Sequence, residues 1–212
     1  LAEAAKKNNI PFVEIPKGYQ PRMTLGFQFG SLIKILHNNK IIKEVKEIYD
    51  LEKSLKPKEL EKEGKSIAKN LKNKIILVYT SNRLKDLSRI WKIKFNENSK
   101  TPAFFNYFPE LNHNEINSFA AAPKILKKFQ AVILKDRAEN NKILKRMEIT
   151  ASILKSKGVG VNFIEIKGKN ILEKIFSNLI LSDWASYYLA LNQKVDPLPV
   201  KIVEDFKKKL KE

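Results

Sequence analysis

The sequence has 212 residues, of which 43% are hydrophobic and 30% charged, and its 41 basic and 23 acidic side chains give a net charge of +18. This length and this apolar content suit one large or two small globular domains and exclude an intrinsically disordered chain. The absence of cysteine excludes a disulfide scaffold, a thiolate metal site and a cysteine nucleophile, and two histidines are too few for a histidine-rich metal centre.

The positive charge comes mainly from lysine and is spread over the whole chain, with 36 Lys and 5 Arg. Many lysines alternate with apolar residues, as in residues 43–48, which is typical of solvated helix faces. Nucleic-acid sites rely more on arginine and interleaved aromatics, so we interpret the charge as a lysine-rich composition and expect no nucleic-acid partner. No apolar run is long enough to span a membrane, and the N-terminus has no secretory pattern, so we expect a cytoplasmic protein without a membrane partner.

The first 36 residues contain three predicted elements. Apolar side chains at helical spacing in residues 1–8 predict the last turns of a helix, and residues 11–16, which begin and end with proline, predict a short strand. A turn marked by Gly18 and Pro21 precedes a strongly apolar helix over residues 23–36. Because apolar side chains cover nearly its whole circumference, we expect this helix to be buried between two bodies.

Residues 38–72 predict two charged amphipathic helices with a break near Pro57, a residue that suits the first turn of the second helix. Apolar side chains recur on one face of this second helix, at Leu60, Ile67, Ala68 and Leu71. We therefore interpret this region as a helical connector rather than a flexible linker.

From residue 74 onward, short apolar runs alternate with helical stretches. The runs are too short for helices and rich in β-branched or aromatic residues, which indicates buried strands; they cover residues 75–79, 103–108, 131–134 and 161–166. The clearest helices cover residues 139–157, which Gly158 ends, and residues 171–191. This alternation predicts an α/β fold, a three-layer αβα sandwich with a mainly parallel sheet preceded by connector helices.

Open parallel sheets bind ligands beyond the carboxyl ends of their strands, so the residues after each predicted strand are candidates for a site. Thr80, Ser81 and Asn82 follow the first strand and lead into a helix. Such residues suit a phosphate or a sugar hydroxyl, and they serve equally well as ordinary helix caps. The chain has no dinucleotide fingerprint, no Walker loop and no Gly-x-Ser-x-Gly elbow.

Two amide-rich segments flank the second predicted strand, residues 96–100 before it and residues 109–115 after it. They place a glutamate, Glu97, and a histidine, His113, among amides instead of within repeating charge. Residues of this kind are typical of turns, and they also match a proton-transfer site. From spacing alone both interpretations stay open.

Four segments of the chain together resemble the bifunctional phosphoglucose/phosphomannose isomerases, a family with two sugar-isomerase (SIS) domains. These segments are residues 18–26 (GYQPRMTLG), residues 89–91 (RIW) with 96–100 (NENSK), residues 109–116 (PELNHNEI), and residues 182–191 (SDWASYYLAL) with 195–197 (VDP). They span most of the chain in the order of the family, and the Asn-His-Asn-Glu run is highly specific.

The resemblance implies an aldose–ketose isomerase that interconverts glucose 6-phosphate, and mannose 6-phosphate, with fructose 6-phosphate through a cis-enediol, without a metal or other cofactor. It implies that Glu97 is the catalytic base and that His113 is delivered from the second subunit of a homodimer. Arg22 matches the arginine of the Gln-Pro-Arg motif. Lys207 is the best placement for a ring-opening lysine, with Lys208 and Lys209 as neighbouring alternatives.

These residue types suit the implied reaction. A partly desolvated carboxylate can carry a proton between two carbons, a guanidinium stabilises an enediolate, and imidazole and ammonium supply the acid and base for ring opening. Thr80, Ser81 and Asn112 are the further candidates for binding the substrate. Without the resemblance, Arg22 would be interpreted as a loop residue and Lys207 as one lysine of a solvated tail.

The resemblance also divides the chain into residues 1–20, matching the last helix and strand of a first SIS domain, connector helices over 21–72, and a second SIS-like domain over 73–212. The phosphate-gripping part of the first domain is absent from the 212 residues. We therefore expect a C-terminal fragment that is inactive alone and exposes apolar surface around Phe27 and Phe29. Asn140 stands where relatives often carry a histidine, and we assign it no catalytic role.

Two further functions stay open. A non-catalytic SIS module would bind a sugar phosphate without converting it, and a basic nucleic-acid binder would show salt-sensitive association with DNA or RNA.

Overall fold

The computed structural model describes residues 1–43 and 46–211, which divide into two units, Leu1–Ser54 and Leu55–Glu212. The first unit contains four helical elements: α1 (Ala2–Lys7), the 3-10 helix η1 (Pro21–Met23), α2 (Leu25–Asn38) and α3 (Lys46–Ser54). Glu44 and Val45, which belong to the predicted lysine-rich helix face, lie outside the described residues. None of the described helices is both long and apolar enough to cross a membrane.

Two predictions for the first unit are wrong, although its helices are where the sequence indicates. Residues 11–16 form no strand, because their two prolines lack an N–H donor and no described strand pairs with them. Helix α2 forms, but none of its side chains is buried, and Phe27 and Leu32 are 45% and 54% exposed. The first unit is itself too small to enclose a helix that is apolar on all sides. Of the two phenylalanines expected to be exposed, Phe27 is exposed and Phe29 is half-buried.

The second unit is built around a sheet of four parallel strands in the order β2-β1-β3-β4. The strands are β1 (Ile75–Ser81), β2 (Ala103–Phe108), β3 (Phe129–Lys135) and β4 (Gly160–Glu165), all within a few residues of the predicted runs. The chain moves from β1 outward to β2 and then returns to the other side of β1 for β3. The boundary between β1 and β3 is therefore the topological switch point of the sheet.

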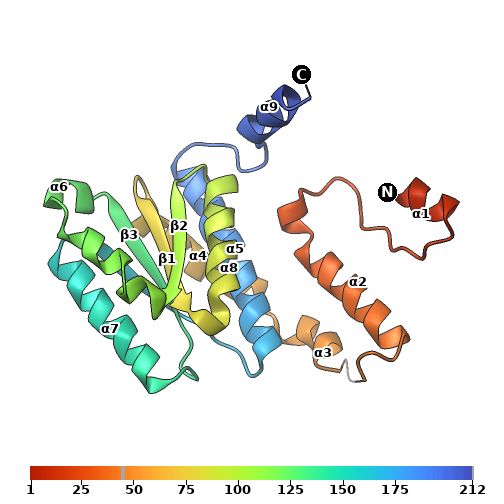
Figure 1. The fold of residues 1–212 in the computed structure, drawn as a ribbon, viewed down its shortest axis with the longest axis horizontal. Helices are drawn as coiled ribbons and strands as arrows, with labels where there is room; N and C mark the ends of the chain where they lie inside the picture. Colours follow the sequence, from red (N-terminus) through yellow and green to blue (C-terminus); the bar gives the residue numbers. More distant parts are fainter. Residues whose placement is uncertain (44–45, 212) are drawn as a thin grey trace. The chain divides into compact units, whose positions relative to one another are not determined.

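Helices cover both faces of this sheet, which confirms the predicted three-layer αβα sandwich (Figure 1). One face carries α4 (Pro57–Leu71), α5 (Lys85–Glu97) and α8 (Ile171–Asn192), and the other carries α7 (Asn141–Ser156) and the short helices η3 (Glu110–Asn112), η4 (Glu115–Ala120) and α6 (Pro123–Leu126). Successive side chains of β1 point to opposite faces of the sheet and therefore belong to two different cores. Ile76 and Val78 pack in the first core, and Leu77 and Tyr79 pack in the second.

Helices α4 and α8 pack at very short range. A methyl group at Gly64 would overlap Trp184 Cβ and lie 2.9 Å from the Ala185 backbone nitrogen. The indole of Trp184 donates a hydrogen bond of 3.0 Å to the Pro57 carbonyl, and the Tyr188 hydroxyl donates to Glu61 at 2.5 Å. Helix α4 is therefore an integral layer of the second unit.

Two further elements complete this unit. The 3-10 helix η2 (Asn82–Leu84) joins β1 to α5, and α9 (Lys201–Lys209) follows α8. Helix α9 has no buried residue, and Ile202 and Phe206 are 85% and 60% exposed.

Candidate functional site

The segment 96–100 forms the turn between α5 and β2, at the amino edge of the sheet. Asn96 Nδ2 donates to the Thr101 carbonyl at 2.9 Å, and Asn98 Nδ2 donates to Ser186 Oγ on α8 at 2.9 Å. Ser99 Oγ donates to the Phe95 carbonyl at 2.7 Å, and Lys100 Nζ donates to the Glu97 carbonyl at 2.6 Å. Each neighbour of Glu97 in this motif thus helps to fix the backbone that carries it.

Glu97 is the last residue of α5, and its half-buried side chain lines a cavity of about 570 Å³. The rest of the lining comes from the same turn and from the segment that leads into α9: Asn96, Lys100, Thr101, Pro102, Val195, Asp196, Pro199, Val200, Lys201, Ile202 and Val203. The structure therefore places this half-buried carboxylate in an open cavity whose accessible wall is mainly apolar.

His113 lies on the other side of β2, in the segment of 3-10 helices that follows the strand. It directly follows η3, its backbone N–H donates to the Glu110 carbonyl at 2.9 Å, and its side chain is exposed. Since β2 has six residues, at about 3.3 Å per step its two ends lie roughly 17 Å apart. Within one chain, Glu97 and His113 therefore lie at opposite edges of the sheet and do not meet.

The two remaining predicted catalytic residues lie on other elements. Arg22 is half-buried in η1 and belongs to the first unit. Lys207 is exposed in the last turn of α9, the helix whose first turn lines the Glu97 cavity. Its neighbour Lys208 lies 3.9 Å from Asp205 in an exposed ion pair.

Two of the predicted substrate-binding residues, Thr80 and Asn112, already have protein partners. The buried Thr80 hydroxyl donates to the Leu134 carbonyl at 3.0 Å, and thereby links β1 to β3. Asn112 Nδ2 donates to Thr150 Oγ1 on α7 at 2.8 Å. Ser81 is buried, and no side-chain hydrogen bond caps η2. These partners account for the positions of Thr80 and Asn112 without a ligand, and a substrate-binding role for the three residues stays a prediction.

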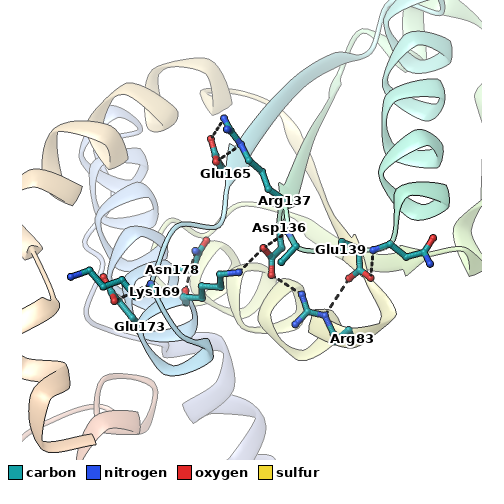
Figure 2. Close-up of polar contacts among 11 residues, drawn as sticks. Arg83, Asp136, Arg137, Glu139, Glu165, Lys169, Glu173 and Asn178 are labelled. Carbon is teal, nitrogen blue, oxygen red and sulfur yellow. Dashed lines mark hydrogen bonds and ion pairs between the residues drawn. The ribbon is translucent and has the colours of Figure 1, made fainter. Parts of the chain in front are cut away.

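A charged network that the sequence analysis missed occupies the switch point between β1 and β3 (Figure 2). Asp136, directly after β3, is 2% exposed and accepts from Arg83 Nη2 at 2.6 Å, from Lys174 Nζ at 2.7 Å and from the Ala138 N–H at 3.0 Å. Arg83 Nε also reaches Glu139 at 3.4 Å. The sequence contained one signal for this network. A charged residue follows each of two predicted strands, Arg83 after residues 75–79 and Asp136 after residues 131–134.

The partners of these two carboxyl groups determine their ionisation. Burial on its own would raise the pKa of Asp136, but hydrogen bonds from Lys174, the Ala138 N–H and Arg83 outweigh it and hold the pKa below its usual range. Glu139 follows the same pattern, because Ser81, the Asn140 N–H and Arg83 together lower its pKa against the effect of burial. The two carboxylates and the two cations, Arg83 and Lys174, balance one another, so this network offers a phosphate no uncompensated positive charge.

The described residues include no group of three or more His, Cys, Asp and Glu side chains that could hold a metal ion.

Solved structures with the same architecture define the class of this fold. Glucosamine-6-phosphate deaminase from Thermotoga maritima superposes with a TM-score of 0.65 over 92% of this chain and 61% of its own, at 16% identity. A glucose-6-phosphate isomerase like protein from Thermus thermophilus gives a TM-score of 0.53 over 63% of this chain and 44% of its own, at 21% identity. With its four parallel strands between helical layers, the second unit is an α/β domain of the sugar-isomerase (SIS) type.

The chain belongs to the family described as the bacterial phospho-glucose isomerase C-terminal SIS domain, whose model matches residues 60–210. It is 33% identical to the bifunctional phosphoglucose/phosphomannose isomerase of Aquifex aeolicus and 36% identical to that of Caldicellulosiruptor bescii. Both alignments cover the whole chain but only 65% and 66% of the relatives, so the chain spans about two thirds of their length. The resemblance inferred from the sequence motifs is confirmed.

Proposed function

We propose that this chain is the C-terminal part of an aldose–ketose isomerase that interconverts glucose 6-phosphate, and mannose 6-phosphate, with fructose 6-phosphate. The observation that carries the proposal is the position of Glu97, on a fixed turn and at the wall of a cavity. Four neighbours of this residue hold the turn between α5 and β2, while its side chain lines a cavity. A carboxylate fixed at a partly apolar wall suits the transfer of a proton between C1 and C2 of the open-chain sugar.

The other roles follow from the family and from the chemistry of each group. Arg22 would stabilise the charge of the cis-enediolate, because a guanidinium stays protonated throughout. His113 and Lys207 would supply the acid and base for ring opening. Lys207 lies on the helix that begins at the Glu97 cavity, which supports its assignment.

A second copy of the chain would supply His113, because Glu97 and His113 of one copy lie at opposite ends of β2. Strand β2 is an edge of the sheet, and Phe104 and Phe105 on it are 58% and 38% exposed. A two-fold axis beside the middle of β2 would set two such strands antiparallel, with the start of each beside the end of the other. This arrangement would bring Glu97 of one copy near His113 of the partner copy.

The phosphate would be bound by the remaining third of the polypeptide that the relatives carry. At the switch point of the sheet in this chain, Arg83 and Lys174 are already paired with Asp136 and Glu139, so these two cations are not free to bind a phosphate. We therefore expect this chain to be inactive as a separate piece.

The test is Glu97→Gln in the protein that carries this chain. The amide keeps the shape of the side chain but cannot accept the substrate proton, so isomerase turnover should fall by about 100-fold or more. Calorimetric titration with fructose 6-phosphate should show unchanged affinity. The matched control is Glu59→Gln on the exposed start of α4, which should leave turnover unchanged.

Turnover that survives Glu97→Gln would show that another group is the base. If the unmodified protein binds the sugar phosphate but never converts it, the chain is instead part of a non-catalytic SIS module.

A further inference from the structure

The segment that carries His113 is fixed to the rest of the domain on both sides of the histidine. On one side, Asn112 Nδ2 donates to Thr150 Oγ1 on α7 at 2.8 Å. On the other side, the carboxylate of Glu115 accepts from the Tyr79 hydroxyl on β1 and from Asn106 Nδ2 on β2, the latter at 2.6 Å. The histidine thus lies between two tethers that reach three different elements.

The Glu115 tether is built from well-defined groups. Tyr79 is completely buried, and burial together with Glu115 raises the pKa of its phenol, which therefore stays a donor. Asn106 has a fixed orientation, because its Oδ1 accepts from the Tyr107 N–H at 2.8 Å and leaves Nδ2 to face Glu115. Both carboxylate oxygens of Glu115 consequently have a donor that cannot easily turn away.

The imidazole of His113 has no tether of its own. Among residues 1–43 and 46–211, it makes no hydrogen bond or ion pair, and the side chain is exposed. The position of the ring therefore depends on the backbone of the segment, and that backbone is held by Asn112 and Glu115.

We propose that Glu115 is a positioning residue, whose carboxylate, shared between Tyr79 and Asn106, holds the His113 imidazole where it can act on the substrate. The role in turnover rests on the proposed function, whereas the control of the imidazole position by Glu115 does not. Glu115 itself touches no reacting atom in this scheme.

The first test follows the imidazole directly. The chain has only two histidines, so [15N]histidine labelling gives two sets of ring signals, and the set of His37 serves as an internal reference. Glu115→Ala should broaden or shift the His113 signal, because the backbone that carries the ring becomes mobile, and should leave His37 unchanged. Glu115→Gln should restore most of the wild-type signal, because the amide oxygen can still accept from Asn106 while the amide nitrogen donates to the Tyr79 oxygen.

Two further variants keep this test decisive. Glu110→Ala removes another glutamate of the same segment, one whose carboxylate accepts only from Asn114 within that segment, and should leave the His113 signal in place. Tyr79→Phe removes one donor to Glu115 and keeps the aromatic ring in the core. It should produce a smaller effect than Glu115→Ala and covers the case in which that variant does not fold.

The second test measures turnover in the protein that carries the chain. Glu115→Ala should lower kcat roughly tenfold to a hundredfold with little change in KM, because a catalytic group displaced by about 1 Å loses its geometry. Glu115→Gln should recover most of this loss.

An unmoved His113 signal in both Glu115→Ala and Tyr79→Phe overturns the positioning role, whatever the kinetics. A moved signal without any loss of turnover in Glu115→Ala or in His113→Ala leaves the positioning intact and overturns the proposed use of His113.

Discussion

Asp136 joins three groups at the carboxyl edge of the sheet: Arg83, Lys174 and the Ala138 N–H. Its side chain is almost completely buried, and both oxygens accept from cationic partners, Arg83 and Lys174. Removing one member of a buried ion pair leaves the others uncompensated, which is usually a severe loss.

We expect Asp136→Asn to lower the free energy of unfolding by about 3 kcal/mol at neutral pH. The folded-state pKa of Asp136 is lowered, so its stabilising effect is present above the unfolded pKa of about 4 and is lost as the pH falls through the folded pKa. Urea denaturation from pH 7 down to pH 2.5 should therefore show the wild type approaching the variant at acid pH. Asp205→Asn, in the exposed pair with Lys208, should change stability by less than about 0.5 kcal/mol. A constant gap between wild type and Asp136→Asn at all pH values would contradict the assignment.

For single residues, the neighbours in a motif predicted the candidate site better than the type of the residue did. The amide-rich surroundings of Glu97 pointed to a distinctive site, and the structure gives each surrounding amide a definite hydrogen bond. The Arg83–Asp136 contact links positions 53 residues apart, and single charges after strands do not show which partner they will meet. Thr80 was similarly ambiguous, because its hydroxyl bonds to a carbonyl on a strand that lies far along the chain.

Among the elements, the pair α4 and α8 depends on one small residue. Gly64 lies against the backbone of α8 beside Trp184, with no room for a methyl group. Glycine in a helix interior is unfavourable by about 1 kcal/mol relative to alanine, so the close approach of the two helices must outweigh that cost.

Gly64→Ala should therefore destabilise the chain by about 1–3 kcal/mol in spite of its better helix propensity, because α4 must move away from α8. Thermal unfolding followed by far-ultraviolet circular dichroism measures this loss. Gly30→Ala on α2 is the matched control, since a methyl group there meets nothing within 4 Å, and it should not lower stability. Equal behaviour of the two variants would show that α4 and α8 are not in close contact.

The elements of the second unit were predictable because each strand is a short apolar run. The expected burial holds for the central strands β1 and β3 and is wrong for the edge strands β2 and β4, which are covered by a neighbour on one side only and are partly exposed. Residues 11–16 have the same local appearance but lack a partner strand, and strand formation requires one. The face of α4 was visible from Ile67, Ala68 and Leu71, yet nothing in the sequence indicated that this face packs on α8.

Taken as a whole, the chain concentrates its hydrophobic core in the second unit. The two buried clusters, one on each face of the sheet, are formed entirely by residues from position 60 onward. In contrast, Leu51 is the one buried hydrophobic residue among the described residues of the first unit.

We therefore expect a protein that starts at residue 55 to fold cooperatively, with a midpoint of thermal unfolding close to that of the 212-residue chain. A protein that starts at residue 73 lacks α4, and with it Leu60, Ile67, Ala68 and Leu71 of the first cluster. That protein should be largely unfolded or aggregate, because a broad apolar face is left open to water. Differential scanning calorimetry of both truncations decides the point, and a stable fold without α4 would place the domain boundary at residue 73.

The paired charges between β1 and β3 have a consequence for the search for small molecules that bind this protein. In open α/β folds, ligands usually bind in the crevice where the strand order reverses, yet here Arg83, Asp136, Glu139 and Lys174 satisfy one another at that crevice. A compound directed there would have to break ion pairs before gaining any contact of its own. Screening should begin instead at the amino edge of the sheet. There the cavity beside Glu97 has a mainly apolar wall and is open to a small molecule.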